Sequence, residues 1–147
     1  MSLEENKRLV QRLMDEGHNR HDAVAAAAFY SEDPSNHLRT VGRAGMKAMF
    51  ETLYNVFPDF HYHIEESTAE GDCVVCKVTM TGTHRGQPIV RDAFSGMLND
   101  VAPTGKSVKV FQFHSFRIRE GKIAAHAAVR DDMGMVLQLG LVQRPDR

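Results

Sequence analysis

Two polar residues, Gln112 and His114, interrupt an otherwise apolar strand face in the C-terminal half of the chain. The residues of that face are Val108, Val110, Gln112, His114, Phe116 and Ile118. Side chains alternate between the two faces of a strand, and polar groups among Val, Phe and Ile cost free energy unless partners await them. One hairpin later, Asp131 ends a similar alternating run. This pairing predicts a ligand pocket rather than a plain core.

These side chains could perform acid/base chemistry. His114 could shuttle a proton or donate a hydrogen bond to a carbonyl oxygen that gains negative charge. A poorly solvated pocket would raise the pKa of the Asp131 carboxylate, which suits a general base or acid. Simpler interpretations stay open: His114 could be a core histidine bonded to a neighbour such as Gln112 or Tyr62. Asp131 or Asp132 could instead cap a short helix over residues 133–139.

Other side chains with possible chemistry read as structural. Cys73 and Cys76 lie three apart in a strand-like run, so they point to opposite faces and are expected to be inert thiols. His61 and His63 share a strand face at a spacing that a metal could use, but solvated side chains fit them better. We therefore expect neither a metal nor a cofactor.

The order of elements predicts an α+β fold in which N-terminal helices pack against a curved, mostly antiparallel sheet. Helical spacing of apolar residues predicts helices over residues 3–17, 23–30 and from Gly42 or Gly45 to Pro58. Period-two alternation predicts strands over residues 60–64, 74–84, 108–118 and 123–131, after a short strand near 36–40. Residues 87–101 carry no clear pattern.

Composition favours one soluble domain over residues 1–147. The formal net charge is -1, with 25% charged and 42% hydrophobic residues, so nucleic acid is not expected as a partner. No apolar run is long enough to span a membrane. The early Glu4 and Glu5 do not fit a secretory signal, so a cytoplasmic location is expected.

Short blocks spread along the chain resemble the SnoaL-like polyketide cyclase branch of the nuclear transport factor two-like superfamily. They are FPDF at 57–60, GTHRG at 82–86, PTGK at 103–106, GKI at 121–123 and DDMGMVLQLG at 131–140. The resemblance implies a cone-shaped α+β barrel around a deep pocket, commonly as a homodimer. It implies a small apolar or aromatic ligand, but no single reaction, because the fold hosts several chemistries.

In those cyclases, metal-free acid/base catalysis closes a ring by an intramolecular aldol reaction. The resemblance places the family's pocket histidine at His114. The family's catalytic aspartate lies seven residues after Gly121, where this chain has Ala128. Cyclase-like, isomerase or hydrolase chemistry would then use Asp131 with His114. A non-catalytic binding protein and a dimeric interaction module are the alternatives.

The resemblance and the strand parity suggest further residues that contact the ligand. Asn36 and His37 lie on an early strand where the family often supplies polar pocket groups, and only one of the two can face inward. Tyr62 shares its face with Phe60 and Ile64. His84 ends a strand, so it lies either at the pocket rim or in a solvated loop.

The opposite face of the sheet is also apolar. Phe111, Phe113, Ala124 and Ala128 have the parity that points away from the pocket, and a two-fold dimer would cover them. Ala128 is ambiguous, because the resemblance places it inward while alternation from Asp131 places it outward. A bulge between Ala128 and Asp131 would reconcile the two.

Overall fold

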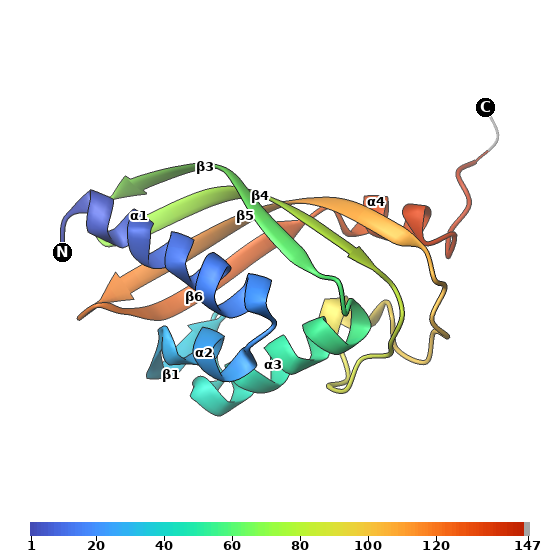
Figure 1. The fold of residues 1–147 in the computed structure, drawn as a ribbon, viewed down its shortest axis with the longest axis horizontal. Coiled ribbons are helices and arrows are strands. Elements are labelled where there is room, and N and C mark those ends of the chain that lie inside the picture. The colour runs from blue at the N-terminus through green and yellow to red at the C-terminus, as the bar shows by residue number, and fades with distance from the viewer. Residues whose placement is uncertain (146–147) are drawn as a thin grey trace.

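A computed structural model describes residues 1–145, in which helices pack on the concave face of a curved six-stranded sheet (Figure 1). The helices are α1 (Leu3–Arg12), α2 (Ala23–Ala28), α3 (Gly42–Val56) and α4 (Asp132–Gln138), with a π-helical turn η1 (Leu13–Gly17) and 3-10 turns η2 (His18–Arg20) and η3 (Ala93–Gly96). The strands are β1 (Tyr30–Asn36), β2 (Arg39–Thr40), β3 (His61–Glu70), β4 (Cys73–Thr83), β5 (Ser107–Arg119) and β6 (Lys122–Arg130). This arrangement confirms the predicted fold class.

The sheet is mixed but mostly antiparallel, with strand order β2-β1-β6-β5-β4-β3. Strands β3 to β6 pair antiparallel in sequence order, whereas β1 joins β6 in parallel and pairs antiparallel with β2. The sheet is open, because β2 and β3 form its two edges. Strands β5 and β6 therefore lie at its centre, where both of their edges are paired.

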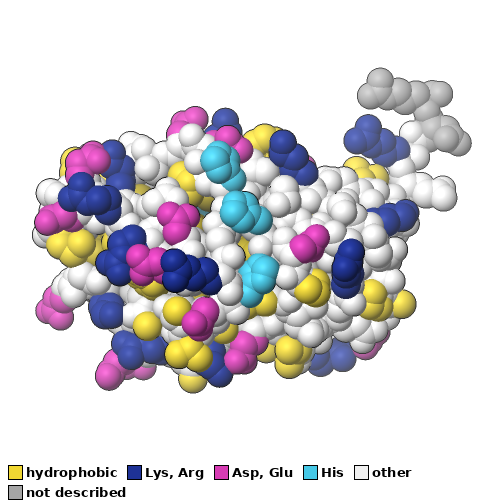
Figure 2. All heavy atoms as spheres, viewed as in Figure 1, with side chains coloured by type: hydrophobic (Ala, Val, Ile, Leu, Met, Phe, Trp, Pro, Cys, Tyr) yellow, Lys and Arg dark blue, Asp and Glu magenta, His cyan; other side chains and the backbone are white. Residues whose placement is uncertain are grey.

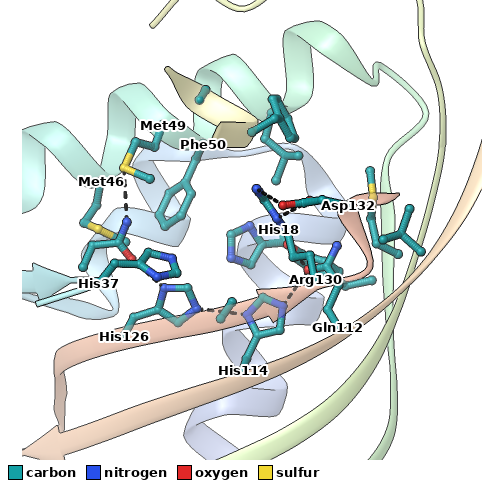
Figure 3. Close-up of a pocket in the computed structure, with 18 of the residues that line it drawn as sticks. His18, His37, Met46, Met49, Phe50, Gln112, His114, His126, Arg130 and Asp132 are labelled. Carbon is teal, nitrogen blue, oxygen red and sulfur yellow. Dashed lines mark hydrogen bonds and ion pairs between the residues drawn. The ribbon is translucent and has the colours of Figure 1, made fainter. Parts of the chain in front are cut away.

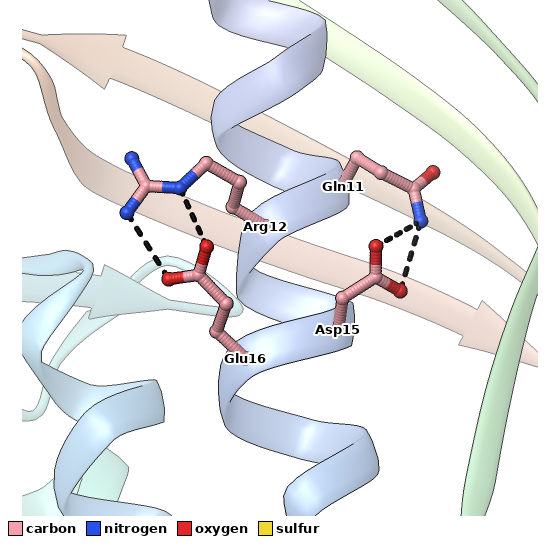
Figure 4. Close-up of polar contacts among 4 residues, drawn as sticks. All are labelled: Gln11, Arg12, Asp15 and Glu16. Carbon is pink, nitrogen blue, oxygen red and sulfur yellow. Dashed lines mark hydrogen bonds and ion pairs between the residues drawn. The ribbon is translucent and has the colours of Figure 1, made fainter.

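Local side-chain contacts fix the N-terminal helix. Ser2 and Glu5 form a reciprocal capping box at the start of α1. Two side-chain pairs one turn apart cross the junction between α1 and η1 (Figure 4). They are Gln11 with Asp15 and Arg12 with Glu16. Both pairs lie on the exposed side, so the opposite side of the helix is left to pack on the sheet.

The π-helical turn brings α2 very close to the end of the first helix. A Cβ on Gly17 would lie 2.7 Å from Ala26 Cα, a distance that no ordinary contact allows. The glycine therefore permits the close approach of α2. The next residue, His18, is directed into the interior and is 4% exposed.

Alternation along β5 follows the sequence prediction. Val108, Val110, Phe116 and Ile118 are buried on the inner face together with Gln112 and His114. On the outer face, Phe111 and Phe113 are 50% and 54% exposed. The predicted inner face of this strand is thus confirmed residue by residue.

Alternation along β6 does not follow the prediction, because a bulge lies earlier than expected. Ile123 pairs with Ile118 and Ala125 pairs with Arg117, so Ala124 is an extra residue in the ladder. Beyond the bulge the parity is reversed. Ala128 faces inward, as the family resemblance implies, and the outward position that simple alternation from Asp131 implies is wrong.

The early strand and the long loop differ from their sequence interpretation. The strand begins at Tyr30 and includes Pro34, and a turn with positive φ at His37 and Leu38 separates it from β2. Residues 87–101 hold only the short η3 turn, whose Phe94 is buried. The Phe94 ring packs edge-on against that of Phe57, which follows α3.

Charges of both signs are mixed on the surface shown in Figure 2, and no large area carries one sign alone. This agrees with the formal net charge of -1. No helix among the described residues is long and apolar enough to cross a membrane.

Candidate functional site

A cavity of about 120 Å³ lies between the concave face of the sheet and the helices. Figure 3 shows the histidines of the sheet on one wall and Met46, Met49 and Phe50 of α3 on the facing wall. The buried lining residues are His18, Tyr30, Asn36, Met46, Phe50, Tyr62, Met80, Phe94, Val110, Gln112, His114, Phe116 and Met135. The more exposed ones are His37, Met49, Leu53, Ala93, His126, Ala128, Arg130 and Asp132.

The cavity brings together most of the residues that the sequence suggested. Gln112, His114 and Tyr62 line it from β5 and β3, and Asn36 and His37 line it from β1 and the following turn. The expectation that only one of Asn36 and His37 faces inward is wrong. The chain leaves the strand at Asn36, so parity no longer governs His37.

A continuous chain of hydrogen bonds crosses the polar wall. His114 Nε2 lies 2.8 Å from Gln112 Oε1, and His114 Nδ1 lies 2.9 Å from His126 Nε2. His126 Nδ1 in turn lies 2.9 Å from Asn36 Oδ1. The expected neighbour Gln112 is therefore found, and a second histidine joins the group.

The two ends of this chain are held by further contacts. The Tyr62 hydroxyl donates to Gln112 Oε1 over 3.4 Å. At the other end, Asn36 Nδ2 contacts Met49 Sδ at 3.5 Å, a weak hydrogen bond. Since His114 and Tyr62 both approach the oxygen of the Gln112 amide, its nitrogen is the end that remains for a ligand.

Burial keeps the cavity histidines neutral. It lowers the pKa of His114 to about 3, and neighbouring His18 and Arg130 add to the shift. Burial likewise lowers the pKa of His126 well below its ordinary value. His18, which hydrogen-bonds the Tyr54 hydroxyl at 2.8 Å, also has a pKa lowered by burial, to about 3. These rings are hydrogen-bonding groups at neutral pH rather than fixed charges.

The charged pair of the cavity lies at the more exposed end of its wall. Arg130 Nε lies 3.1 Å from Asp132 Oδ1, and both side chains are between a quarter and a third exposed. The Arg130 guanidinium also lies 5.5 Å from the centre of the Phe94 ring. Gln112 and Arg130 are register partners on β5 and β6, so their side chains are neighbours.

The expected position of Asp131 is wrong. Asp131 is exposed, does not line the cavity, and caps α4 by accepting a hydrogen bond from Gly134 N at 2.8 Å. Reversed parity in β6 explains the error, because it places Arg130 inward on the last residue of the strand. Asp131 lies beyond the end of β6. The carboxylate at the cavity is that of the next residue, Asp132.

His84 is likewise outside the cavity. It is fully buried, packs against Phe57, and its Nδ1 lies 3.2 Å from Thr104 Oγ1. Both alternatives for this residue, pocket rim and solvated loop, are therefore wrong. Its role in this structure is to join the end of β4 to the loop before β5.

Four polar lining residues were not suggested as pocket residues by the sequence, namely His18, His126, Arg130 and Asp132. His126 and Arg130 were hidden by the bulge in β6, since unbroken alternation assigns them to the outer face. His18 was hidden by the π-helical turn, since it follows a segment whose helical phase is changed. The shared parity of two polar residues, His126 and Arg130, was the available signal.

Ala128 leaves space beside the histidine pair. It is the register partner of His114 and lies between His126 and Arg130 on the inner face of β6. A methyl group at this position fills little of the cavity. A ligand can therefore approach the sheet between the histidine pair and Arg130.

The remaining candidates for metal or redox chemistry lie apart from the cavity. Within residues 1–145, no three His, Cys, Asp or Glu side chains are placed to hold a metal ion together. His61 and His63 are exposed. Cys73 and Cys76 are free thiols, and burial raises the pKa of Cys76 to about 11.

Several solved structures have a fold similar to that of this chain. AclR of Streptomyces galilaeus, a candidate hydroxylase, is 27% identical over 97% of this chain and 100% of its own, with a TM-score of 0.79. TsrD of Streptomyces laurentii is 20% identical, with a TM-score of 0.81 and coverage of 97% and 99%. A SnoaL-like polyketide cyclase of Agrobacterium tumefaciens is 16% identical, with a TM-score of 0.76 and coverage of 95% and 100%. No curated protein matches the chain.

The sequence itself carries the family assignment over most of its length. The model of the SnoaL-like polyketide cyclase family matches residues 8–139, from α1 through the end of α4. This range includes every element that lines the cavity. The resemblance seen in the short sequence blocks is thus confirmed, and the chain belongs to the SnoaL-like polyketide cyclase family.

Proposed function

We propose that the protein is an enzyme that removes a proton from a carbon next to a carbonyl group in a small aromatic or apolar molecule. The observation that carries the proposal is the convergence of Gln112, Arg130 and Asp132 on one apolar cavity. Such a site offers hydrogen-bond donors for an oxygen and a carboxylate for a proton. Cyclisation by an aldol reaction and isomerisation of a double bond can both begin from such a step.

Gln112 and Arg130 are suited to stabilise the oxygen that becomes negative. Their side chains are neighbours across β5 and β6, and both carry N–H donors at the cavity. Because the bonds from Tyr62 and His114 hold the Gln112 oxygen, the amide nitrogen is oriented before the ligand arrives. Donors fixed in a poorly solvated site stabilise a developing oxyanion without reorganisation. His114 is in this account a positioning residue.

Asp132 is suited to accept the proton. It lines the cavity beside Arg130, four residues beyond the family's base position at Ala128. Its Oδ1 is buried and has no hydrogen bond of good geometry among the described residues, although Arg130 Nε is 3.1 Å away. A carboxylate oxygen in that state can act as a general base.

The rest of the lining favours an apolar and variable ligand. Met46, Met49, Met80 and Met135 contribute to the walls, with aromatic rings around them. Methionine side chains adapt to different shapes because they are unbranched and polarisable. We therefore propose a flat aromatic or fused-ring ketone as the substrate class.

Hydrogen exchange tests this function without knowledge of the natural substrate. The probe is 2-tetralone, an aromatic ketone with an acidic methylene group, dissolved in D2O and followed by NMR. We expect the protein to accelerate loss of the methylene signal, and Asp132→Asn to slow the protein-catalysed exchange by about 100-fold. Asp131→Asn is the matched control and keeps the rate, since it lies outside the cavity. Equal rates for the two variants would exclude Asp132 as the base.

A second candidate function is non-catalytic binding of the same class of ligand. Ala128 favours it, because the family's catalytic carboxylate is absent from the position opposite His114. Under this alternative, 2-tetralone shifts the NMR signals of the cavity methionine methyl groups but exchanges its hydrogens at the buffer rate. The exchange experiment therefore separates the two functions.

The outer face of the sheet supports a further proposal, a homodimer. Phe111, Phe113 and Val129 are 50%, 54% and 76% exposed and lie side by side on β5 and β6. An apolar patch of this kind is unusual on a protein that remains monomeric. A two-fold axis through the sheet would bury the patch against its copy.

A further inference from the structure

The hydrogen-bond chain on the cavity wall requires a specific number of protons. Its two ends are the amide oxygens of Gln112 and Asn36, which only accept. Between them lie two imidazole rings joined by a third contact. Each of the three contacts needs one proton, whereas two neutral rings carry two. With both amide oxygens facing the rings, all three contacts are hydrogen bonds only when one of the two rings is an imidazolium.

Rotation of an amide by half a turn makes the chain neutral. With the Asn36 amide rotated, its N–H donates to His126, and the ring protons all point toward Gln112. With the Gln112 amide rotated instead, the ring protons all point toward Asn36, but the Tyr62 hydroxyl loses its acceptor on Gln112, so rotation of Asn36 is the favoured arrangement. The orientation of the two end amides thus depends on the proton count of the histidine pair.

Electrostatics decide which proton count is stable. The titratable and charged groups that line the cavity around the pair are His18, Tyr30, His37, Tyr62, Arg130 and Asp132. Arg130 repels a third proton, and Asp132, the one carboxylate among the described lining residues, is already paired with Arg130. A buried imidazolium without an anionic partner is costly. The empty cavity therefore favours the neutral pair.

An anionic oxygen in the cavity reverses this balance, since it supplies the missing partner. In the three-proton state, the Gln112 oxygen still accepts from His114 and Tyr62, so Gln112 presents its N–H to the anionic oxygen. We propose that the His114–His126 pair takes up a third proton when the cavity is occupied, so that the site binds enols and phenols as their oxyanions. This deepens the proposed function, because it names the acidic hydroxyl on an unsaturated carbon as the feature that the site recognises.

The third proton of the histidine pair comes either from the ligand or from solvent. Below the pKa of the free ligand, the ligand O–H bond breaks and an N–H bond forms on the histidine pair, with no net exchange with solvent. If the ring protons of the neutral pair point toward Gln112, the added proton binds His126 Nδ1. If they point toward Asn36, it binds His114 Nε2. Above the ligand pKa, the oxyanion binds directly and one proton is taken from solvent.

A phenol whose ionised form absorbs visible light tests the inference. The probe is 4-nitrophenol, and nitrobenzene is its neutral analogue. We expect the ionisation midpoint of bound 4-nitrophenol to fall by about 1 to 2 pH units relative to the free probe. In protein labelled with 15N-histidine, the ring nitrogens of His114 and His126 become protonated with 4-nitrophenol and stay as in the free protein with nitrobenzene.

Two variants sharpen the test. Asn36→Leu removes the acceptor for the third proton, so the midpoint of the bound probe returns toward that of the free probe. Gln87→Glu, an exposed loop change, is the control and leaves the midpoint unchanged. If Asn36→Leu fails to fold, the comparison of the two probes on the natural protein still decides.

Three results would overturn the inference. The first is that 4-nitrophenol binds as the neutral phenol. The second is that it binds as the phenolate while the histidine pair stays neutral. The third is that the protein binds nitrobenzene but does not bind 4-nitrophenol. The probe has no acidic C–H bond, so its result is independent of hydrogen exchange from 2-tetralone. Failure of the catalytic proposal and failure of this inference are therefore distinguishable.

Discussion

Ala128 lies directly opposite His114 in the β5–β6 ladder, where the family resemblance expects a catalytic aspartate. A carboxylate restored at this position would face the cavity beside the histidine pair. We expect Ala128→Asp to raise the rate of hydrogen exchange from 2-tetralone by about 10- to 100-fold, the contribution of an added general base. NMR in D2O measures the rate.

The matched control is Ala127→Asp, whose side chain lies on the outer face of the same strand. It adds the same charge outside the cavity and leaves the rate unchanged. If the Ala128→Asp protein folds but shows no faster exchange, this would contradict the proposal that the substrate carbon that loses its proton lies against the β5–β6 wall of the cavity.

Asp131 has a structural role that stability measurements can isolate. Its carboxylate accepts a hydrogen bond from Gly134 N and caps α4. Asp131→Ala should lower the free energy of unfolding by about 1 kcal/mol, the usual value of an N-cap, whereas Asp131→Asn retains the cap. Urea denaturation measures both. Loss of 2-tetralone binding in a folded Asp131→Asn protein would show that this residue contributes to the site after all.

Mild acid should destabilise the fold through its buried histidines. His18 and His114 have folded-state pKa values lowered to about 3, so they stay neutral while the unfolded chain protonates them below about pH 6.5. The unfolded state then binds more protons, and the free energy of unfolding falls as pH decreases from 6.5 toward 5. The slope is about 1.4 kcal/mol per pH unit for each such histidine.

Urea denaturation between pH 7.5 and 5 tests this, since ordinary carboxylates are still ionised there. His18→Phe should reduce the slope by the share of one histidine. The exposed His63→Asn is the control and keeps the slope of the natural protein. A stability that does not change from pH 7 to 5 would mean that these rings are solvated.

The outer sheet face should control oligomeric state. Phe113 is 54% exposed at the centre of the apolar patch, with Val129 as its register partner. Phe113→Lys places a charge in the proposed interface, so sedimentation velocity should show a monomer where the natural protein is a dimer. The control is Arg119→Glu, at the exposed end of β5. A natural protein that sediments as a monomer would rule out this interface.

The sequence predicted the parts of the fold where local pattern and tertiary environment agree. Strict alternation on β5 identified Gln112 and His114 as inward-facing, because β5 pairs with β4 without a register shift and the extra residue in its pairing with β6 belongs to β6. The apolar stripe of α3 was equally clear, with Met46 and Phe50 buried as expected.

The rest depended on irregular backbone that no side-chain pattern announces. One extra residue, Ala124, exchanged the two faces of β6, which hid His126 and Arg130 and misplaced Asp131. The π-helical turn before His18 similarly altered a helical phase. Polar cavities gather such irregularities, since they redirect side chains that regular elements would send elsewhere.

Hydrogen exchange from 2-tetralone, measured with and without 4-nitrophenol as a competitor, tests the central claim most directly. If Gln112, Arg130 and Asp132 form an acid/base site in the cavity, the natural protein exchanges the methylene hydrogens faster than buffer, and 4-nitrophenol suppresses that rate as it fills the cavity. Exchange at the buffer rate, while methionine methyl signals show 2-tetralone bound in the cavity, would contradict it.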